Sequence, residues 1–211
     1  MLTLYSFFRS SASWRVRICL ALKGVSYTLV PVNLRDAARD SPEYRALNPQ
    51  AFVPTLVTEE GALTQSLAII EYLESLYPEP ALLPIAPIDR ARVQAMAALI
   101  ASDIHPLNNL RVLNYLRKSL SLDEQKITAW YQHWVNEGLQ ALEHMVTAYG
   151  GEYCFGRRIT IADVCLVPQM YNARRFAVDL APYPRLQAID SRLQSLFAFT
   201  DSAPEKQIDA V

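Results

Sequence analysis

Three serines, Ser10, Ser11 and Ser13, stand directly before an apolar stretch that begins at Trp14, and their type and spacing could do chemistry. Serine is a preferred N-cap residue, because its hydroxyl accepts a hydrogen bond from a backbone N–H group of the first helical turn. The free N–H groups and the positive end of the helix dipole also favour an anion there. The cluster therefore predicts an anion-binding helix N-terminus. An ordinary capped surface helix is the alternative, and this stretch alone does not decide between the two.

The elements that would position the serines are a strand and a helix. Residues 2–5 form a short apolar run that is typical of a strand. From Trp14 onward the apolar residues are those of a helix, which closes at Lys23 and Gly24. The cluster would then lie at the joint between strand and helix. Three arginines would add positive charge near it: Arg9, Arg15 and Arg17.

The next residues complete a small α/β layer. Residues 27–32 are rich in β-formers, and their prolines favour the edge of a sheet or the end of a strand. Residues 55–57 and 62–64 flank a turn and predict a hairpin, after which Ser66 would cap a helix. The order β-α-β, then β-β-α, is that of a thioredoxin-type layer, in which we expect a cis bond at Val53-Pro54.

The second half of the chain has the pattern of helices only. Four prolines between residues 78 and 87 mark a linker. Capping signatures at Ser121–Glu124 and Thr160–Asp163 open two helices, and a last helix is predicted from Tyr183 to Phe197. We therefore predict an α/β N-terminal thioredoxin-like domain, a linker and an all-α helical domain, over residues 1–79, 80–87 and 88–211.

Composition argues against several classes of partner. The 211 residues carry a formal net charge of −1 with scattered Lys and Arg, so no nucleic-acid partner is predicted. No signal-peptide pattern and no apolar run of membrane-spanning length is present, so we expect a soluble cytoplasmic protein with no membrane partner. The histidines and cysteines have no metal-ligand spacing, so no metal is expected. Buried reduced thiols are expected at Cys19, Cys154 and Cys165.

Disulfide exchange by the protein's own cysteines does not fit this layer. A thioredoxin-type layer carries its reactive cysteine pair at the start of the first helix, where this chain has Ser10, Ser11, Ala12 and Ser13. Hydroxyl donors, backbone amides and a helix dipole suit a thiolate that another molecule brings.

The stretch from Ser10 to Ile18, SSASWRVRI, closely resembles the SSCxWRVRI signature of the zeta-class glutathione transferases, the maleylacetoacetate isomerases. The resemblance covers essentially the whole chain, because further motifs follow in the family's order: NP at 48–49, VPTL at 53–56, QSLAIIEY at 65–72 and IAD at 161–163. The first-helix signature is specific to the class, whereas the later motifs at 65–66 and 160–163 are shared with most glutathione transferases. Residues 105–109 and 172–176 also look like those of bacterial maleylpyruvate isomerases of the same class.

The resemblance implies a glutathione site. Ser10 would donate to the glutathione sulfur and hold it as a thiolate, and Ser11 would assist as a second catalytic residue. The backbone of Val53 would pair with the cysteinyl part, and Gln65 and Ser66 would receive the γ-glutamyl carboxylate at another helix N-terminus. The implied glutathione-binding residues are Ser10, Ser11, Ala12, Ser13, Trp14, Arg15, Val53, Gln65, Ser66, His105, Asn109 and Arg111.

The resemblance also implies a substrate with carboxylates, for which Arg9, Arg111 and Arg175 are the candidates, because an arginine fork matches a carboxylate bidentately. Simpler alternatives stay open: His105 before a proline could be a helix-kink residue, and Arg175 could be a solvated surface charge. We interpret Asp163 as a structural capping partner of Thr160.

The function that the resemblance implies is glutathione-dependent cis-trans isomerisation of a maleyl keto-diacid, maleylacetoacetate or maleylpyruvate, in aromatic catabolism, by a homodimer. The family's motif cysteine is Ala12 here, so inactivation through that thiol should be absent, and the maleylpyruvate branch is favoured. One alternative is a glutathione transferase or dehalogenase acting on small α-halo acids. Another is a non-catalytic glutathione-transferase-like binding protein, against which the intact Ser10, Gln65 and Ser66 argue. The sequence does not tell which maleyl acid is natural.

Overall fold

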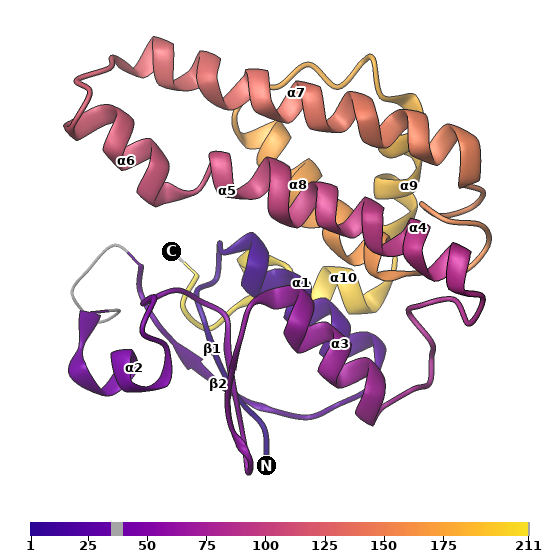
Figure 1. The fold of residues 1–211 in the computed structure, drawn as a ribbon, viewed down its shortest axis with the longest axis horizontal. Coiled ribbons are helices and arrows are strands. Elements are labelled where there is room, and N and C mark those ends of the chain that lie inside the picture. Colours follow the sequence, from indigo (N-terminus) through magenta and orange to yellow (C-terminus); the bar gives the residue numbers. More distant parts are fainter. Residues whose placement is uncertain (35–39, 211) are drawn as a thin grey trace. The chain divides into compact units, whose positions relative to one another are not determined.

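The computed structural model describes residues 1–34 and 40–210, and the chain forms two compact units (Figure 1). The first unit comprises residues 1–81 and 195–211, and the second comprises residues 82–194. The last 17 residues, which the sequence analysis placed in the helical domain, thus pack with the first unit. A local sequence pattern carries no signal for such a return.

A four-stranded sheet is the centre of the first unit. Its strands are β1 (Thr3–Ser6), β2 (Thr28–Pro31), β3 (Thr55–Thr58) and β4 (Gly61–Thr64), in the order β2-β1-β3-β4. β1 runs parallel to β2 and antiparallel to β3, with Leu4 opposite both Leu29 and Leu56. The mixed sheet confirms the predicted thioredoxin-like layer, and β2 lies at an edge, as its prolines predicted.

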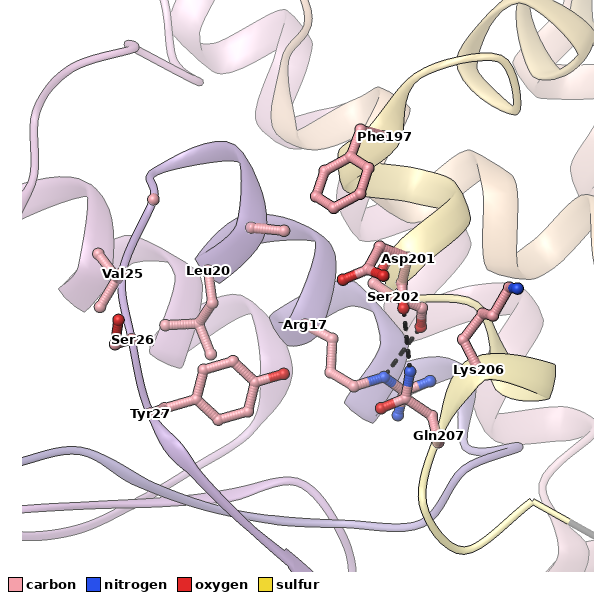
Figure 2. Close-up of a pocket in the computed structure, with 12 residues that line it drawn as sticks. Arg17, Leu20, Val25, Ser26, Tyr27, Phe197, Asp201, Ser202, Lys206 and Gln207 are labelled. Carbon is pink, nitrogen blue, oxygen red and sulfur yellow. Dashed lines mark hydrogen bonds between the residues drawn. The ribbon is translucent and has the colours of Figure 1, made fainter.

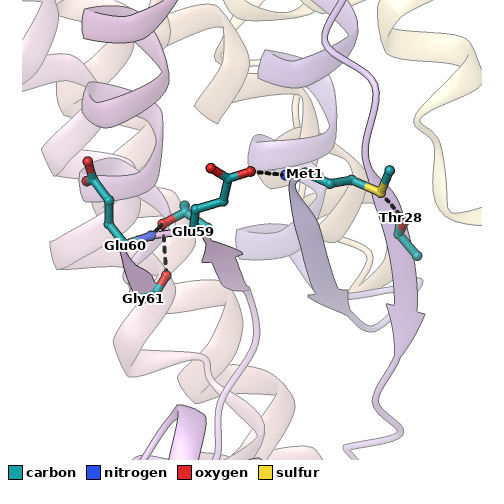
Figure 3. Close-up of polar contacts among 6 residues, drawn as sticks. Met1, Thr28, Glu59, Glu60 and Gly61 are labelled. Atoms are coloured by element: carbon teal, nitrogen blue, oxygen red, sulfur yellow. Dashed lines mark hydrogen bonds and ion pairs between the residues drawn. The ribbon is translucent and has the colours of Figure 1, made fainter.

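The N-terminus is held across this sheet (Figure 3). The ammonium group of Met1 lies 3.0 Å from a carboxylate oxygen of Glu59 in the β3–β4 turn. The hydroxyl of Thr58 donates to the carbonyl of Gly61 and accepts from the N–H group of Glu60 within the same turn. Both members of the ion pair are exposed, so it contributes little to stability.

The helices of the first unit are α1 (Ser11–Leu22), α2 (Pro42–Leu47), α3 (Ser66–Leu76), α10 (Phe197–Asp201) and the short 3₁₀-helix η3 (Pro204–Lys206). α1 packs against both α3 and α10 (Figure 1). Lys23, which follows α1, has a buried side chain whose ammonium group lies 2.7 Å from the carboxylate of Glu74 in α3. The same group donates to the carbonyl oxygens of Tyr77 and Pro80 at the end of α3.

The second unit is helical throughout its described elements, as predicted. They are α4 (Pro87–Ala98), a π-helical segment η2 (Leu99–Ile104), α5 (His105–Leu107), α6 (Leu110–Lys118), α7 (Glu124–Tyr149), α8 (Ile161–Arg175) and α9 (Pro184–Leu193). α8 is its centre: residues 161–170 are all buried, and the helix packs against α4, α9 and η2. None of the described helices is long and apolar enough to cross a membrane.

Asp163 is a structural residue, as its position in the sequence predicted. Its carboxylate accepts hydrogen bonds from the N–H group and hydroxyl of Thr160, at 2.8 and 2.9 Å, and from the N–H group of Cys154 at 2.8 Å. The predicted capping box at the start of α8 is therefore present, and it also ties the preceding loop to the helix.

Two other predicted caps were wrong. Ser66 is the first residue of α3, and Gln65 occupies the N-cap position with φ of 70°. Ser121 has φ of 53°, which is left-handed, so it cannot take the extended conformation of an N-cap. Asp123 caps α7 instead, because its carboxylate accepts from the N–H group of Lys126 at 2.8 Å.

The last predicted helix was also too long. The segment from Tyr183 to Phe197 contains α9, which ends at Leu193, and the first residue of a separate helix, α10. Leu196 is extended, with φ of −93° and ψ of 136°, and therefore separates the two helices.

Candidate active site

Ser10 is the N-cap of α1, at the joint that the sequence predicted. Its hydroxyl oxygen accepts a hydrogen bond from the N–H group of Ser13 at 3.2 Å. Its own N–H group donates to the carbonyl of Phe7 at 3.0 Å, so the turn from Phe7 to Ser10 is closed. A serine hydroxyl has one proton to donate besides its acceptor sites. Within the described residues that proton has no acceptor, so Ser10 can donate to a bound anion.

The other residues of the first turn of α1 have small side chains, which leave the backbone N–H groups of the turn close to its surface. Ser11 and Ser13 are buried, and Ala12 is half-buried. The hydroxyl of Ser13 is enclosed and has no hydrogen-bond partner in the described part of the chain. The first N–H groups of a helix have no intrahelical partner, and the helix dipole places partial positive charge at them. This turn therefore favours an anion.

The N-terminus of α3 lies beside α1 and is linked to it through Arg15. The guanidinium of Arg15 is 1% exposed and donates to the hydroxyl of Ser66 at 3.3 Å. Gln65 is held in a left-handed conformation, which costs a non-glycine residue energy and is characteristic of functional sites. Its amide nitrogen donates to the side-chain oxygen of Gln50 at 3.0 Å. The structure thus joins the N-termini of two helices through one buried cation.

The loop before β3 carries Val53, and the bond to Pro54 is cis, as predicted. Val53 is buried, and neither its N–H nor its C=O group has a hydrogen-bond partner within residues 1–34 and 40–210. A buried extended segment with open backbone groups can pair with a peptide.

A buried polar cluster fixes this loop. The side-chain nitrogen of Asn48 donates to the carbonyl of Phe52 at 2.8 Å and to the hydroxyl of Thr55 at 3.2 Å. The hydroxyl of Tyr44 also donates to the carbonyl of Phe52. Burial raises the pKa of Tyr44 above its ordinary value, so this hydroxyl stays protonated and continues to donate. Because the cluster is built from side chains on α2, at its C-cap and on β3, it holds the loop independently of any ligand.

Two further predicted residues of the first unit have other contacts. The indole nitrogen of Trp14, its only polar side-chain atom, donates to the hydroxyl of Ser202 at 3.1 Å. Arg9 is partly exposed, and its guanidinium carbon lies 5.2 Å from the ring centre of Phe8. Trp14 therefore bonds α1 to the segment that follows α10. The charge of Arg9, in contrast, remains accessible next to Ser10.

The second unit contains the remaining predicted residues, and three of them lie at the α5–α6 joint. His105 begins α5, and Asn109 caps α6 by accepting from the N–H group of Arg111 at 3.1 Å. The joint is anchored on α7, because the indole of Trp130 donates to the carbonyl of Leu107 at 2.9 Å. The helix is irregular before His105, where η2 is π-helical, but it continues through His105-Pro106 and ends after Leu107.

Arg175 lies at the C-terminal end of α8 and is exposed. Its guanidinium carbon is 5.1 Å from the ring centre of Phe176, which stacks on the ring of Tyr131 with centres 3.6 Å apart. Burial raises the pKa of Tyr131 well above its ordinary value, and the charge of Arg175 lowers it. The α5–α6 joint also meets Tyr131, whose carbonyl accepts from Asn108 at 3.4 Å. α7 therefore contacts both the α5–α6 joint, which carries His105 and Asn109, and the end of α8, which carries Arg175.

The cysteines are free and buried, as predicted. Burial, followed by the nearby carboxylate of Asp163, raises the pKa of the Cys154 thiol well above its ordinary value, so this thiol is protonated and unreactive. Across the described residues, no group of three or more His, Cys, Asp or Glu is placed to hold a metal ion.

The sequence analysis did not identify the residues whose hydrogen bonds support the loops and turns of the candidate site. Asn48 and Thr55 lie in the motifs at 48–49 and 53–56, but no motif indicates their contacts with each other and with Tyr44, or the contact of Gln50 with Gln65. The carboxylate of Asp209 accepts from the N–H group of Phe8 at 3.0 Å. Asp209 is 201 positions away in the sequence, so no spacing argument could have found that contact.

Comparison with known proteins places the chain in a family. Residues 4–81, which contain the sheet, α1 and α3, match the family model described as the glutathione S-transferase N-terminal domain. The class of protein that the first unit defines is thus a glutathione transferase.

The particular family follows from full-length relatives. The chain is 47% identical to a probable maleylacetoacetate isomerase of Vibrio cholerae, over 99% of this chain and 98% of that one. It is also 47% identical to a maleylpyruvate isomerase whose solved structure is described as a bacterial zeta-class glutathione S-transferase, with a TM-score of 0.96 over 99% and 100% of the chains. A maleylacetoacetate isomerase of Anaeromyxobacter dehalogenans, solved with glutathione in its active site, has 42% identity and a TM-score of 0.91, over 100% and 98% of the chains. This chain belongs to the zeta-class glutathione transferases, the family of the maleylacetoacetate and maleylpyruvate isomerases.

Proposed function

We propose that this protein is a glutathione-dependent cis-trans isomerase that acts on a maleyl keto-diacid, maleylacetoacetate or maleylpyruvate. The observation that carries the proposal is Ser10. Its hydroxyl caps α1 and keeps a proton to donate at the helix N-terminus, in a chain that is 47% identical over nearly its whole length to an isomerase of this class.

The residues of the first unit fit glutathione. The buried backbone of Val53 has open N–H and C=O groups that suit the cysteinyl amide of a peptide. Ser66 and the first N–H groups of α3 suit the γ-glutamyl carboxylate, and the buried guanidinium of Arg15 adds positive charge behind them. The first turn of α1 suits the sulfur as an anion, because Ser10 donates to it and the helix dipole stabilises it.

Glutathione, when bound, supplies a thiolate that adds to the activated double bond, allows rotation about it and then leaves, so that it is not consumed. Ser10 holds the negative charge on the sulfur by donating its hydroxyl proton as a hydrogen bond. Ser11 assists from the adjacent position, together with the backbone N–H groups of the turn. Gln65, held by Gln50, and Ser66 bind the amino-acid end, and the rigid loop at Val53 fixes the peptide between the two ends.

Cationic side chains bind the carboxylates of the substrate in this proposal. Arg9 is accessible next to Ser10, and Arg111 and Arg175 are exposed in the second unit. An arginine fork forms two parallel hydrogen bonds with a carboxylate, which gives orientation as well as energy. His105 and Asn109 at the α5–α6 joint contribute polar contacts to glutathione or substrate.

The assembly and location are part of the same proposal and rest on resemblance to the class: a cytoplasmic homodimer. Sedimentation or light scattering at several protein concentrations tests the dimer. A mass near the 23.8 kDa of one chain at all concentrations would contradict it.

The deciding experiment is steady-state kinetics with maleylacetoacetate and maleylpyruvate side by side, with and without glutathione. We expect isomerisation of at least one acid, dependent on glutathione that is fully recovered after many turnovers. The acid with the higher kcat/KM identifies the natural substrate class. Consumption of glutathione with α-halo acids and no isomerisation of either maleyl acid would replace this proposal with a transferase or dehalogenase. Failure to retain glutathione would leave a non-catalytic relative.

A further inference from the structure

The C-terminal segment, defined here as residues 195–210, packs against α1. Phe199 of α10 is 1% exposed, and α10 contacts α1. Ser202, which follows α10, contacts α1 twice: its hydroxyl accepts from the indole of Trp14 at 3.1 Å, and its carbonyl accepts from the guanidinium of Arg17 at 3.0 Å. Figure 2 shows Arg17 with its guanidinium directed at Ser202 and Gln207, beside a surface pocket.

Arg17 connects this segment with the turn that leads to Ser10. The side chain is 1% exposed. Besides its bond to Ser202, it donates to the hydroxyl of Ser6 at 3.0 Å and to the carbonyl of Phe8 at 2.9 Å. Burial lowers the pKa of Arg17 to about 10, so it remains charged at neutral pH. One buried cation thus bonds the end of β1, the turn and the C-terminal segment at the same time.

Asp209 completes the support of this turn. Its carboxylate accepts a hydrogen bond from the N–H group of Phe8 at 3.0 Å. The C=O group of Phe8 accepts a hydrogen bond from Arg17. Both backbone groups of Phe8 are therefore bound by charged side chains, and such hydrogen bonds are stronger than neutral ones. Phe8 is two residues before Ser10, whose N–H group bonds Phe7 within the same turn. The place of the Ser10 hydroxyl therefore depends on a contact supplied by the chain's last few residues.

We propose that Asp209 is a positioning residue: through Phe8 it sets the place of the Ser10 hydroxyl, and with it the stabilisation of the thiolate. The inference rests on the proposed role of Ser10. Asp209 does not touch glutathione or substrate in this account. A merely structural Asp209 would add to the stability of the fold without affecting the thiol.

The test compares Asp209→Ala and Asp209→Asn with the control Asp201→Ala. Asp201 belongs to the same segment and is exposed, so its replacement removes the same charge without touching Phe8. Amide hydrogen exchange in the glutathione-free protein is the first readout. We expect the N–H groups of Phe8 and Ser10 to exchange about 10-fold faster or more in Asp209→Ala, while that of Leu56 in β3 is unchanged.

The second readout is the pKa of the bound glutathione thiol, followed by the ultraviolet absorbance of the thiolate against pH. In Asp209→Ala we expect this pKa to rise and kcat to fall about 10- to 100-fold, with the dissociation constant of glutathione changed less than about threefold. The asparagine variant should recover most of the loss, because its amide oxygen can still accept from Phe8. Asp201→Ala should match the wild type in every readout.

Two results would overturn the inference. One is an unchanged thiol pKa and kcat in a folded Asp209→Ala, whatever its thermal stability. The other is unchanged exchange at Phe8 and Ser10. A chain shortened to end at Gln207 gives the same test by a second route and should behave as Asp209→Ala does. Failure of the proposed function is seen separately, in the wild type, as absence of isomerisation.

Discussion

Ser10 has two tasks that use different parts of one hydroxyl. As an acceptor it binds the N–H group of Ser13 and starts α1, and as a donor it has a proton for an anion. The first task is structural and common, because Ser41 does the same for α2 by accepting from the N–H group of Tyr44 at 3.2 Å. The second is specific to the place of Ser10 in the first unit. Comparing the two serines therefore separates capping from chemistry.

Ser10→Ala should lower turnover by a factor of roughly 10² to 10³, because removing one donor to a charged centre costs ~3–4 kcal/mol. It should also lower stability by about 1 kcal/mol through loss of the cap. Glutathione should still bind, since Gln65 and Ser66 are untouched. Ser41→Ala is the matched control and should lose the cap energy only. Unchanged turnover in Ser10→Ala would remove this hydroxyl from the mechanism.

Ala12 stands where the class has a cysteine, and the three cysteines of this chain are buried. We expect a water-soluble disulfide reagent to label no thiol in the folded protein within the time of an assay and to label all three after unfolding. Activity should survive the treatment. Ala12→Cys should create one reactive thiol, because the position is half-buried at a helix N-terminus, which lowers a thiol pKa. Rapid labelling of the folded wild type would contradict this prediction.

Single residues were predictable where the pattern is local. A serine cap from the cluster at Ser10, Ser11 and Ser13 and the pairing of Thr160 with Asp163 are confirmed, because each depends on residues three apart along the chain. The predicted N-caps at Ser66 and Ser121 were wrong. The backbone at Gln65 and at Ser121 is left-handed, and the residue types at these positions do not predict that conformation. The contacts of Gln50 and Asp209 could not be predicted, since their partners are distant in sequence.

At the scale of elements, the close approach of α7 to η2 depends on one glycine. A Cβ atom on Gly138 would lie 2.2 Å from Cγ1 of Ile104, far inside contact distance. Ile104 is 1% exposed, so its side chain cannot turn into solvent. The π-helical segment ends directly before His105-Pro106, where a proline cannot donate the usual helical hydrogen bond. The α5–α6 joint, with Asn109 and Arg111, follows this contact.

Gly138→Ala should therefore destabilise the second unit, although alanine is the better helix former. The gain in helix propensity is about 1 kcal/mol, and overpacking costs about 1–3 kcal/mol, so we expect a net loss of up to ~2 kcal/mol in urea unfolding. Ile104→Ala should be destabilising alone but should relieve the clash in the double variant, so the two changes should sum to less than their separate costs. A Gly138→Ala protein more stable than the wild type would show that α7 can move away without cost.

Helices and strands were predictable where the periodicity of the apolar residues and the positions of glycine and proline indicate the same boundaries. The strands and α1 follow their predicted ranges to within a few residues, and α7 and α8 begin where their capping signatures predicted to within a few residues. The last helix was predicted as one because its apolar residues continue past Leu193, whereas the structure separates α9 from α10 at an extended Leu196. The cause is tertiary: α9 belongs to the second unit, whereas α10 belongs to the first unit, where it packs on α1. A local pattern cannot report such a change of partner.

At the scale of the whole molecule, the proposed site residues come from both units. The proposed thiolate site, with Ser10, Val53 and Ser66, belongs to the first unit, and Arg111 and Arg175 belong to the second. The first unit is itself built from both ends of the chain, so the last 17 residues are part of the glutathione-binding half. The sequence predicted both halves by composition and motif but assigned that tail to the wrong one.

Arg175 distinguishes an isomerase of diacids from a general transferase. A dianionic substrate needs cationic groups, whereas a neutral hydrophobic electrophile needs only the glutathione thiolate that the first unit is proposed to hold. Arg175→Met keeps the length and removes the charge and its hydrogen-bond fork. For the maleyl acid, kcat/KM should fall by an amount that corresponds to a loss of ~1.5–3 kcal/mol of transition-state stabilisation. This is the range for a hydrogen bond to a charged group. Turnover of a neutral electrophile should be nearly unchanged.

Arg174→Met is the matched control for Arg175→Met, because Arg174 precedes it in α8 and lies 2.6 Å from the carboxylate of Asp190. Asp190 is buried, so losing Arg174 should lower the stability of the second unit. It should leave the ratio of the two activities, charged over neutral substrate, at the wild-type value. Arg175→Met should lower that ratio at least 10-fold while the fold is as stable as before, since the side chain is exposed. Equal losses on both substrates in Arg175→Met would assign Arg175 to glutathione binding, and no loss on either would make it a surface charge.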